Sequence, residues 1–132
     1  MRKRLMRASL VLMALCIYLQ WGRGVSVRNT ISSSWDGKRT EYMTIVANKL
    51  YIGDKEAFAG EMIETCINNE FRDVRFSYDM GYPAEITMDI YTNETARRLG
   101  IRCCEVRYAQ PEKDRYRYNV KDDRERFVMT VK

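Results

Sequence analysis

The residues in this sequence most able to do chemistry are its thiols. Cys103 and Cys104 are adjacent, and Cys66 lies in a segment whose apolar residues recur every three or four positions. Neighbouring side chains on a strand point to opposite faces, so we expect Cys104 to face the core and Cys103 to face outward. Two alternatives follow for Cys66 and Cys104: a disulfide across the core in an oxidising compartment, or two buried free thiols. Cys103, next to Arg102 and near Arg107, is a candidate redox thiol.

Carboxylates are the second possible source of chemistry, because the sequence contains no histidine. The absence of histidine excludes Ser-His-Asp and Cys-His nucleophiles and histidine-ligated zinc. Glu85 and Asp89 share the outward face of one expected strand and could serve a two-carboxylate hydrolysis. With 18 acidic residues in the chain, however, such pairs arise by chance. We identify no catalytic residue, and we expect neither a metal site nor a cofactor.

Candidate binding residues come from the outward positions of the expected strands. Arg75, Asp89 and Arg107 alternate with apolar residues, which places them on the solvent side of a sheet. Tyr116 and Tyr118 belong to the sequence RYRY, which is typical either of an edge strand protected by arginines or of a surface that stacks on single-stranded nucleic acid.

The distribution of charge argues against nucleic acid. The formal net charge is +5, but five of the 23 basic residues and none of the 18 acidic residues lie within residues 1–24. The rest of the chain therefore carries 18 residues of each sign. A neutral domain lacks the electrostatic footprint of a nucleic-acid binder, so we expect no nucleic-acid partner.

Residues 1–24 have the form of an export signal, with a basic start, an apolar centre and a glycine-containing exit. Residues 5–21 would make a helix of about 25 Å, which suits a cleaved signal peptide and is borderline for an uncleaved membrane anchor. A helix of a soluble fold and lipid attachment at Cys16 are further alternatives. Because the basic cluster precedes the apolar run, both main alternatives export the domain.

The remaining chain predicts a linker over residues 25–40 and a small domain over 41–132. Tyr42–Val46 and 49–52 suggest a hairpin with a turn at Asn48. Asp54 should cap a helix that runs to about Asn69 and carries one apolar stripe. Period-two alternation predicts further strands over 73–79, 85–90, 103–108 and 127–131, with an additional one over 116–120, and a short helix or turn lies over 93–99.

The expected fold class is α+β: an antiparallel meander sheet packed against one long amphipathic helix, preceded by an N-terminal signal or anchor helix. The expected function is a non-catalytic module outside the cytoplasm, secreted or tethered through residues 5–21, that binds a protein or a cell-envelope component. The alternative is a small exported enzyme that depends on thiol redox chemistry or on carboxylates.

Overall fold

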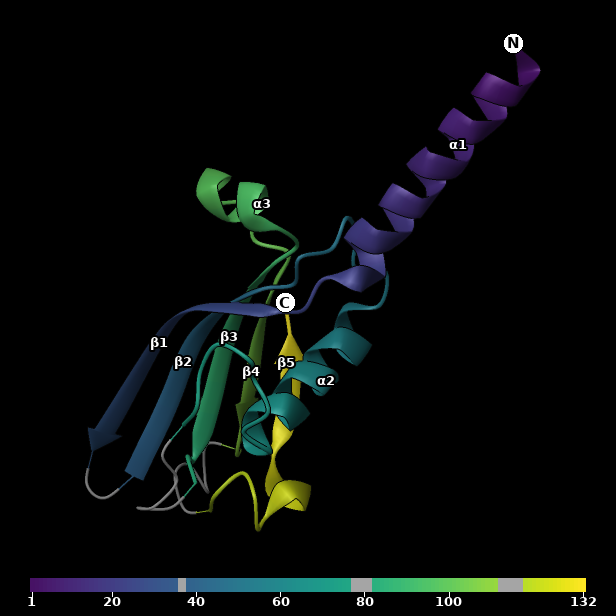
Figure 1. Ribbon diagram of the computed structural model, residues 1–132. Helices are drawn as coiled ribbons and strands as arrows, with labels where there is room; N and C mark the ends of the chain where they lie inside the picture. The colour runs from purple at the N-terminus through teal and green to yellow at the C-terminus, as the bar shows by residue number, and fades with distance from the viewer. Residues whose placement is uncertain (36–37, 77–81, 112–117) are drawn as a thin grey trace.

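The structure is a computed structural model of the 132-residue chain and describes residues 1–35, 38–76, 82–111 and 118–132. A long N-terminal helix projects from an α+β domain (Figure 1). The helices are α1 (Arg2–Ile17), which continues into a π-helical turn (Tyr18–Gly22), α2 (Lys55–Ile67) and α3 (Glu94–Leu99). The strands are β1 (Ser26–Trp35), β2 (Lys38–Val46), β3 (Glu85–Tyr91), β4 (Cys104–Ala109) and β5 (Val128–Val131).

The five strands form one mixed sheet in the order β1-β2-β3-β4-β5. β2 and β3 are parallel, and the other neighbouring pairs are antiparallel. The α+β class is thus confirmed, whereas the expectation of a purely antiparallel meander is wrong. Period-two alternation reports which face of a strand is buried but not the direction of the strand. The direction of β3 follows from the connection through α2, which returns the chain to the end of the sheet where β2 began.

The helix α2 covers one face of the sheet and contributes one side of the core (Figure 1). Asp54 caps it as expected: its side chain accepts a hydrogen bond of 3.0 Å from the backbone N–H of Ala57. The predicted stripe is buried in the core, together with the inward residues of β2, β3 and β4. Its members are Phe58, Met62, Ile63, Cys66 and Ile67.

The segment expected to be a linker is instead the edge strand β1 and the beginning of β2. Ser32, Ser33 and Ser34 pair through their backbones with residues 39–41 of β2. Their side chains are exposed, because an edge strand needs backbone hydrogen bonds but little apolar burial. A serine-rich composition therefore resembles a linker even where the backbone is part of a sheet.

The predicted hairpin between Tyr42–Val46 and residues 49–52 is also wrong. The hairpin partner of β2 is β1, and residues 47–53 form a loop. Asn48 adopts a left-handed conformation with φ of 56° directly after the strand, which asparagine tolerates better than most residues. Asn48 therefore ends β2 and does not join two strands of a hairpin.

The later predictions had mixed outcomes. Strands β3, β4 and β5 are confirmed, as is the short helix α3, which Asn93 caps and Gly100 ends with φ of 73°. Residues 73–76 and 118–120 contain no strand, so alternation alone was insufficient there. The other residues of those two predicted strands, 77–79 and 116–117, lie outside the described part of the chain.

Candidate functional site

The most distinctive surface of the molecule is the N-terminal helix. The helical segment Arg2–Gly22 is 21 residues long, an 18-residue window of it has a mean hydropathy of 1.5, and no residue of that window is buried. Leu10, Met13 and Ile17 are 63%, 60% and 52% exposed. At about 1.5 Å per residue, the apolar run of residues 5–21 spans about 25 Å, which approaches the thickness of the hydrocarbon core of a bilayer when flanking basic side chains reach the interface. A signal or anchor segment has these properties.

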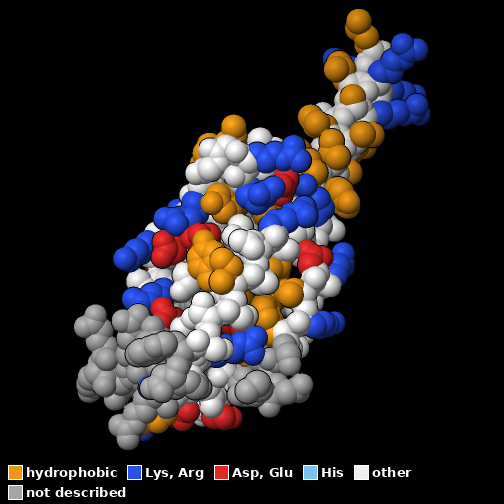
Figure 2. Space-filling view, turned by 90° about the vertical axis from the view of Figure 1, so that its left-hand side faces the viewer, with side chains coloured by type: hydrophobic (Ala, Val, Ile, Leu, Met, Phe, Trp, Pro, Cys, Tyr) orange, Lys and Arg blue, Asp and Glu red, His pale blue; other side chains and the backbone are white. Residues whose placement is uncertain are grey.

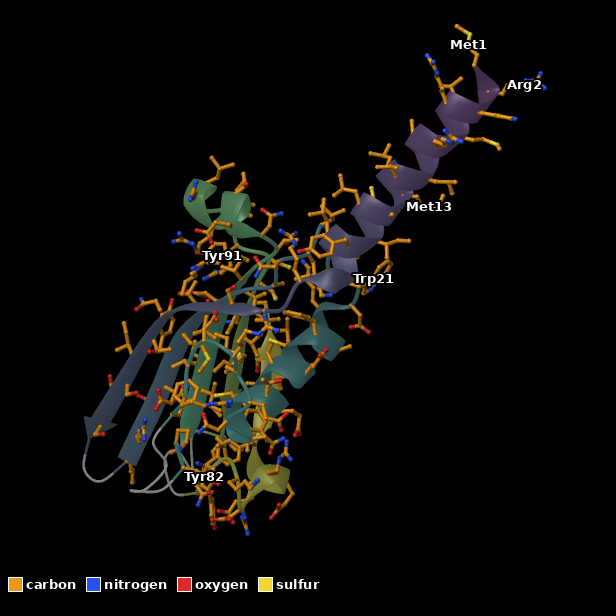
Figure 3. All side chains as sticks on the ribbon, in the orientation of Figure 1. Met1, Arg2, Met13, Trp21, Tyr82 and Tyr91 are labelled. Carbon is orange, nitrogen blue, oxygen red and sulfur yellow. The ribbon has the colours of Figure 1, made fainter. Side chains whose placement is uncertain are left out.

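Apolar side chains project from α1 in every direction, as those between Met1 and Trp21 show in Figure 3. In the space-filling view, basic side chains on α1 gather near its free end, whereas charged and apolar groups are interspersed over the domain (Figure 2). A helix that is apolar all round needs an apolar environment on every side. The domain does not supply that environment.

The lower end of this helical segment is hydrogen-bonded to the loop of residues 47–53. The Gln20 side-chain oxygen accepts hydrogen bonds from the backbone N–H groups of Leu50 (2.9 Å) and Tyr51 (3.0 Å). Its side-chain nitrogen donates to the Tyr51 carbonyl at 2.6 Å. The Lys49 ammonium donates to the Gln20 carbonyl at 3.0 Å. These four bonds attach the helical segment to the domain, and we call them the Gln20 junction.

A second contact extends the attachment into the connection before β1. The Asn48 side chain donates to the Gly24 carbonyl at 2.8 Å and to the Ser26 hydroxyl at 2.9 Å. The Arg23 guanidinium also donates to the Leu19 carbonyl at 3.1 Å and covers the end of the helical segment. Gln20 and its hydrogen-bond partners in residues 49–51 were not predicted from the sequence. The sequence feature that could have indicated Gln20 is its polar side-chain amide, which lies between the apolar residues Leu19 and Trp21.

The sheet face opposite α2 carries Asp89 and Arg107, two of the candidate binding residues. Asp89 of β3 lies opposite Glu105 of β4, and Arg102 bridges the two carboxylates at 2.9 and 3.2 Å. The Tyr42 hydroxyl donates a hydrogen bond to Asp89. That bond, followed by burial, raises the pKa of Tyr42 to about 12.

Arg107 lies beside this group and is opposite Thr87 in the strand pairing. Its guanidinium contacts the Glu85 carboxylate at 2.8 Å. We call Tyr42, Glu85, Thr87, Asp89, Arg102, Glu105 and Arg107 together the polar sheet face. Each carboxylate on it has a cationic partner, so the surface is polar but nearly neutral.

The other candidate binding residues lie elsewhere. Arg75 follows α2 in an irregular segment, where its guanidinium donates to the Asn69 carbonyl. Tyr118 pairs through its backbone N–H with the Gln110 side chain, and the Arg126 guanidinium lies 4.3 Å from the centre of its ring. Tyr116 is outside the described residues. The structure therefore does not bring Arg75 or Tyr118 together with Asp89 and Arg107.

The cysteines are free thiols in the structure. Cys66 and Cys104 are buried in the same core, whereas Cys103 is partly exposed. Burial, followed by the charge and hydrogen bond of neighbouring Cys103, raises the pKa of Cys104 to about 11. Cys104 is thus held in the thiol form, which is neither a nucleophile nor a metal ligand.

The described residues contain no group of three or more Cys, Asp or Glu side chains placed to hold a metal ion. One depression beside β4 and β5 is lined by Glu105, Arg107, Thr130 and Lys132. Its carboxylate is accompanied by two basic groups and by no second acid. This arrangement does not resemble the paired carboxylates of a glycosidase.

Comparison of the chain with models of protein families, with curated proteins and with solved structures found no match.

Proposed function

We propose that the protein is a membrane-anchored, non-catalytic interaction module, in which α1 crosses the bilayer once and the α+β domain lies at the outer surface. The observation that carries the proposal is the helical segment Arg2–Gly22, which is apolar from Ala8 onward and contains no buried residue. Arg2, Lys3, Arg4 and Arg7 precede the apolar run and only Arg23 follows it directly. This asymmetry favours an N-terminus that stays in the cytoplasm.

The Gln20 junction favours an uncleaved anchor over a cleaved signal peptide. Cleavage near Gly24 would remove Gln20, which makes three side-chain bonds to the loop of residues 47–53. A segment destined for removal gains nothing from hydrogen bonds to the mature domain. An anchor does gain, because the bonds set the orientation of the domain relative to the membrane.

The polar sheet face is the surface that we assign to partner binding within this proposal. No helix of the described residues lies over it, and α2 occupies the opposite face (Figure 1). Tyr and Arg, which this face presents at Tyr42 and Arg107, are enriched in protein interfaces. Arg107, whose side chain is 49% exposed, is its most accessible cation.

The enzymatic alternative has less support. Arg102, the cation expected to activate Cys103, is engaged by Asp89 and Glu105. Glu85 and Asp89, the expected acid pair, are each bound to an arginine. No further observation favours catalysis by these groups.

The test is the N-terminal residue and the extraction behaviour of the full chain expressed in cells. An anchored protein keeps its first 24 residues, stays in the membrane pellet after alkaline carbonate washing, and loses its domain to protease added outside sealed cells. A soluble exported protein that begins near Val25 would contradict the anchor and favour a released module. Full-length protein in the cytosol would contradict both.

Partner binding has a separate test. A photo-crosslinking residue in place of Thr87 on the polar sheet face should yield a discrete crosslinked product in intact cells, and Arg107→Glu should abolish it. The matched control places the crosslinker at Glu61, which is exposed on α2 on the opposite side of the sheet. Equal products from both positions would contradict a specific contact at the polar sheet face.

A further inference from the structure

The sheet topology gathers several loops at the end of the domain from which the N-terminal helix emerges. The register pairs Ser26 with Val46, Val46 with Tyr91, and Ile90 with Cys104. The start of β1, the ends of β2 and β3 and the start of β4 are therefore at one end of the sheet. Figure 3 shows Tyr91 at this end, on the same side as Trp21, and Tyr82 at the other. We call it the helix end.

Exposed apolar side chains are concentrated at the helix end. Beyond residue 22, six large hydrophobic residues in the described part of the chain are exposed, and four of them are here. Tyr51 and Leu50 in the loop after β2 are 68% and 49% exposed. Leu99 and Ile101, between α3 and β4, are 69% and 62% exposed. Such a concentration on an otherwise polar domain indicates a contact surface.

The exposure of Leu99 and Ile101 is built into the backbone. Gly100 between them is left-handed, and the N–H groups of Gly100 and Ile101 donate to the carbonyls of Arg97 (3.1 Å) and Ala96 (2.9 Å). This pattern is the Schellman motif, in which the residue at the position of Ile101 usually packs back on its own helix. Here that side chain projects into solvent from a hydrogen-bonded turn.

The charge around α3 complements an anionic surface. Glu94 is bound by three arginines: Arg28 at 3.3 Å, Arg97, and Arg98 at 3.8 Å. One carboxylate among three guanidinium groups leaves two net positive charges next to Leu99. The Arg98 side chain is 76% exposed and is free to reach outward. Apolar residues beside arginines are the usual composition of a surface that enters a lipid headgroup layer.

We propose that the helix end is a second membrane-contact surface, in which Leu99, Ile101, Leu50 and Tyr51 enter the interface of the bilayer that α1 crosses and the α3 arginines contact lipid phosphates. This inference depends on the proposed anchor. The bilayer is the occupant because the Gln20 junction holds the loop of Leu50 and Tyr51 directly against the end of the membrane-spanning segment. The domain thus lies on the membrane in a defined orientation, in which the polar sheet face points along the plane of the membrane and not into the bilayer.

The experiment measures quenching of single tryptophans by brominated lipids, with the full chain reconstituted in vesicles of phosphatidylcholine and phosphatidylglycerol. Trp35→Phe leaves Trp21 as the reporter of the anchor. Ile101→Trp, with Trp21→Phe and Trp35→Phe, reports the helix end. Ser33→Trp in the same background is the control, because Ser33 is exposed on β1 far from the helix end.

The proposal expects strong quenching and a blue-shifted emission for the tryptophan at position 101, and neither for the tryptophan at position 33. Adding Arg98→Glu should reduce the quenching at position 101 in anionic vesicles.

Quenching of Trp21 with none at position 101 would overturn this inference and leave the anchor intact. No quenching of Trp21 would overturn the anchor itself. A tryptophan at position 101 shielded from acrylamide but not quenched by lipid would overturn the bilayer contact in favour of a second copy or a protein partner.

Discussion

At the scale of single residues, the structure contains a buried thiol and a hydrogen-bonded phenol whose protonation is tied to folding. Cys104 and Tyr42 have pKa values raised to about 11 and about 12. The cause is burial for Cys104 and the Asp89 hydrogen bond for Tyr42. Both groups are neutral when protonated, so the fold favours their protonated forms.

We therefore expect the free energy of unfolding to fall as pH rises from about 9 to about 12. In that range the unfolded chain releases the two protons first, near the usual pKa values of 9.0 and 10.0. The native state binds more protons than the unfolded state, and stability then decreases with pH. Below pH 9 both groups are protonated in either state and the effect is fully present.

Urea unfolding of the full chain in detergent at several pH values measures this dependence. Cys104→Ala should flatten the lower part of the decline and Tyr42→Phe the upper part. A decline of unchanged steepness in both variants would show that other groups cause it. Cys16→Ala, which removes an exposed thiol outside the core, serves as the control.

At the scale of elements, α2 depends on its first turn and on its buried stripe. Asp54→Ala removes the side-chain hydrogen bond to the Ala57 N–H and should lower the free energy of unfolding by about 1 kcal/mol. Asp54→Asn retains an acceptor at the cap and should lose much less. Chemical denaturation of the three proteins measures the difference. Equal losses in both variants would assign the effect to the charge and not to the cap.

The Gln20 junction makes a different kind of prediction, because its bonds are solvent-exposed. Gln20→Ala should speed hydrogen exchange of the Leu50 and Tyr51 amides, which lose their acceptor, while global stability changes by less than about 0.5 kcal/mol. Gln20→Glu keeps an acceptor oxygen and should protect both amides partially. Hydrogen-exchange mass spectrometry on the full chain measures the exchange of the Leu50 and Tyr51 amides in the three proteins. Unchanged exchange in Gln20→Ala would show that the junction does not persist in solution.

At the scale of the whole molecule, the structure divides into a domain that buries its own core and a helix that does not contribute to it. Leu12 is 62% exposed on α1, so a substitution there should leave the domain folded. An arginine at the centre of a membrane-spanning helix costs about 2.5–3.5 kcal/mol.

We expect Leu12→Arg to deplete the protein from the membrane fraction, with Leu12→Phe as the apolar control. Fractionation followed by immunoblotting measures the distribution, and denaturation of the purified variant verifies that the domain is unaffected. Full retention of Leu12→Arg in washed membranes would contradict a spanning role for α1.

The features that could be predicted from the sequence are those that depend on residues close to one another along the chain. The apolar N-terminal segment, the α2 stripe and cap, and the alternation in β3 and β4 are local patterns, and each was recognised. Asp89 and Arg107 were placed on one face for the same reason. Arg75 was misplaced because residues 73–76 alternate without a neighbouring strand to pair with. Gln20 was missed because its partners lie 30 and 31 residues away.

The sequence by itself determined where apolar surface occurs along the chain: all round the N-terminal helix, along one stripe of α2, and on every second residue of the central strands. Only the tertiary structure decided which strands pair and in which direction, that the serine-rich segment is an edge strand, and that four loops meet at the helix end. The physical reason is the distance along the chain over which each kind of interaction acts. Helix and strand periodicity are set by neighbouring residues, whereas strand partners and surfaces are chosen by contacts between distant segments competing to bury the same core.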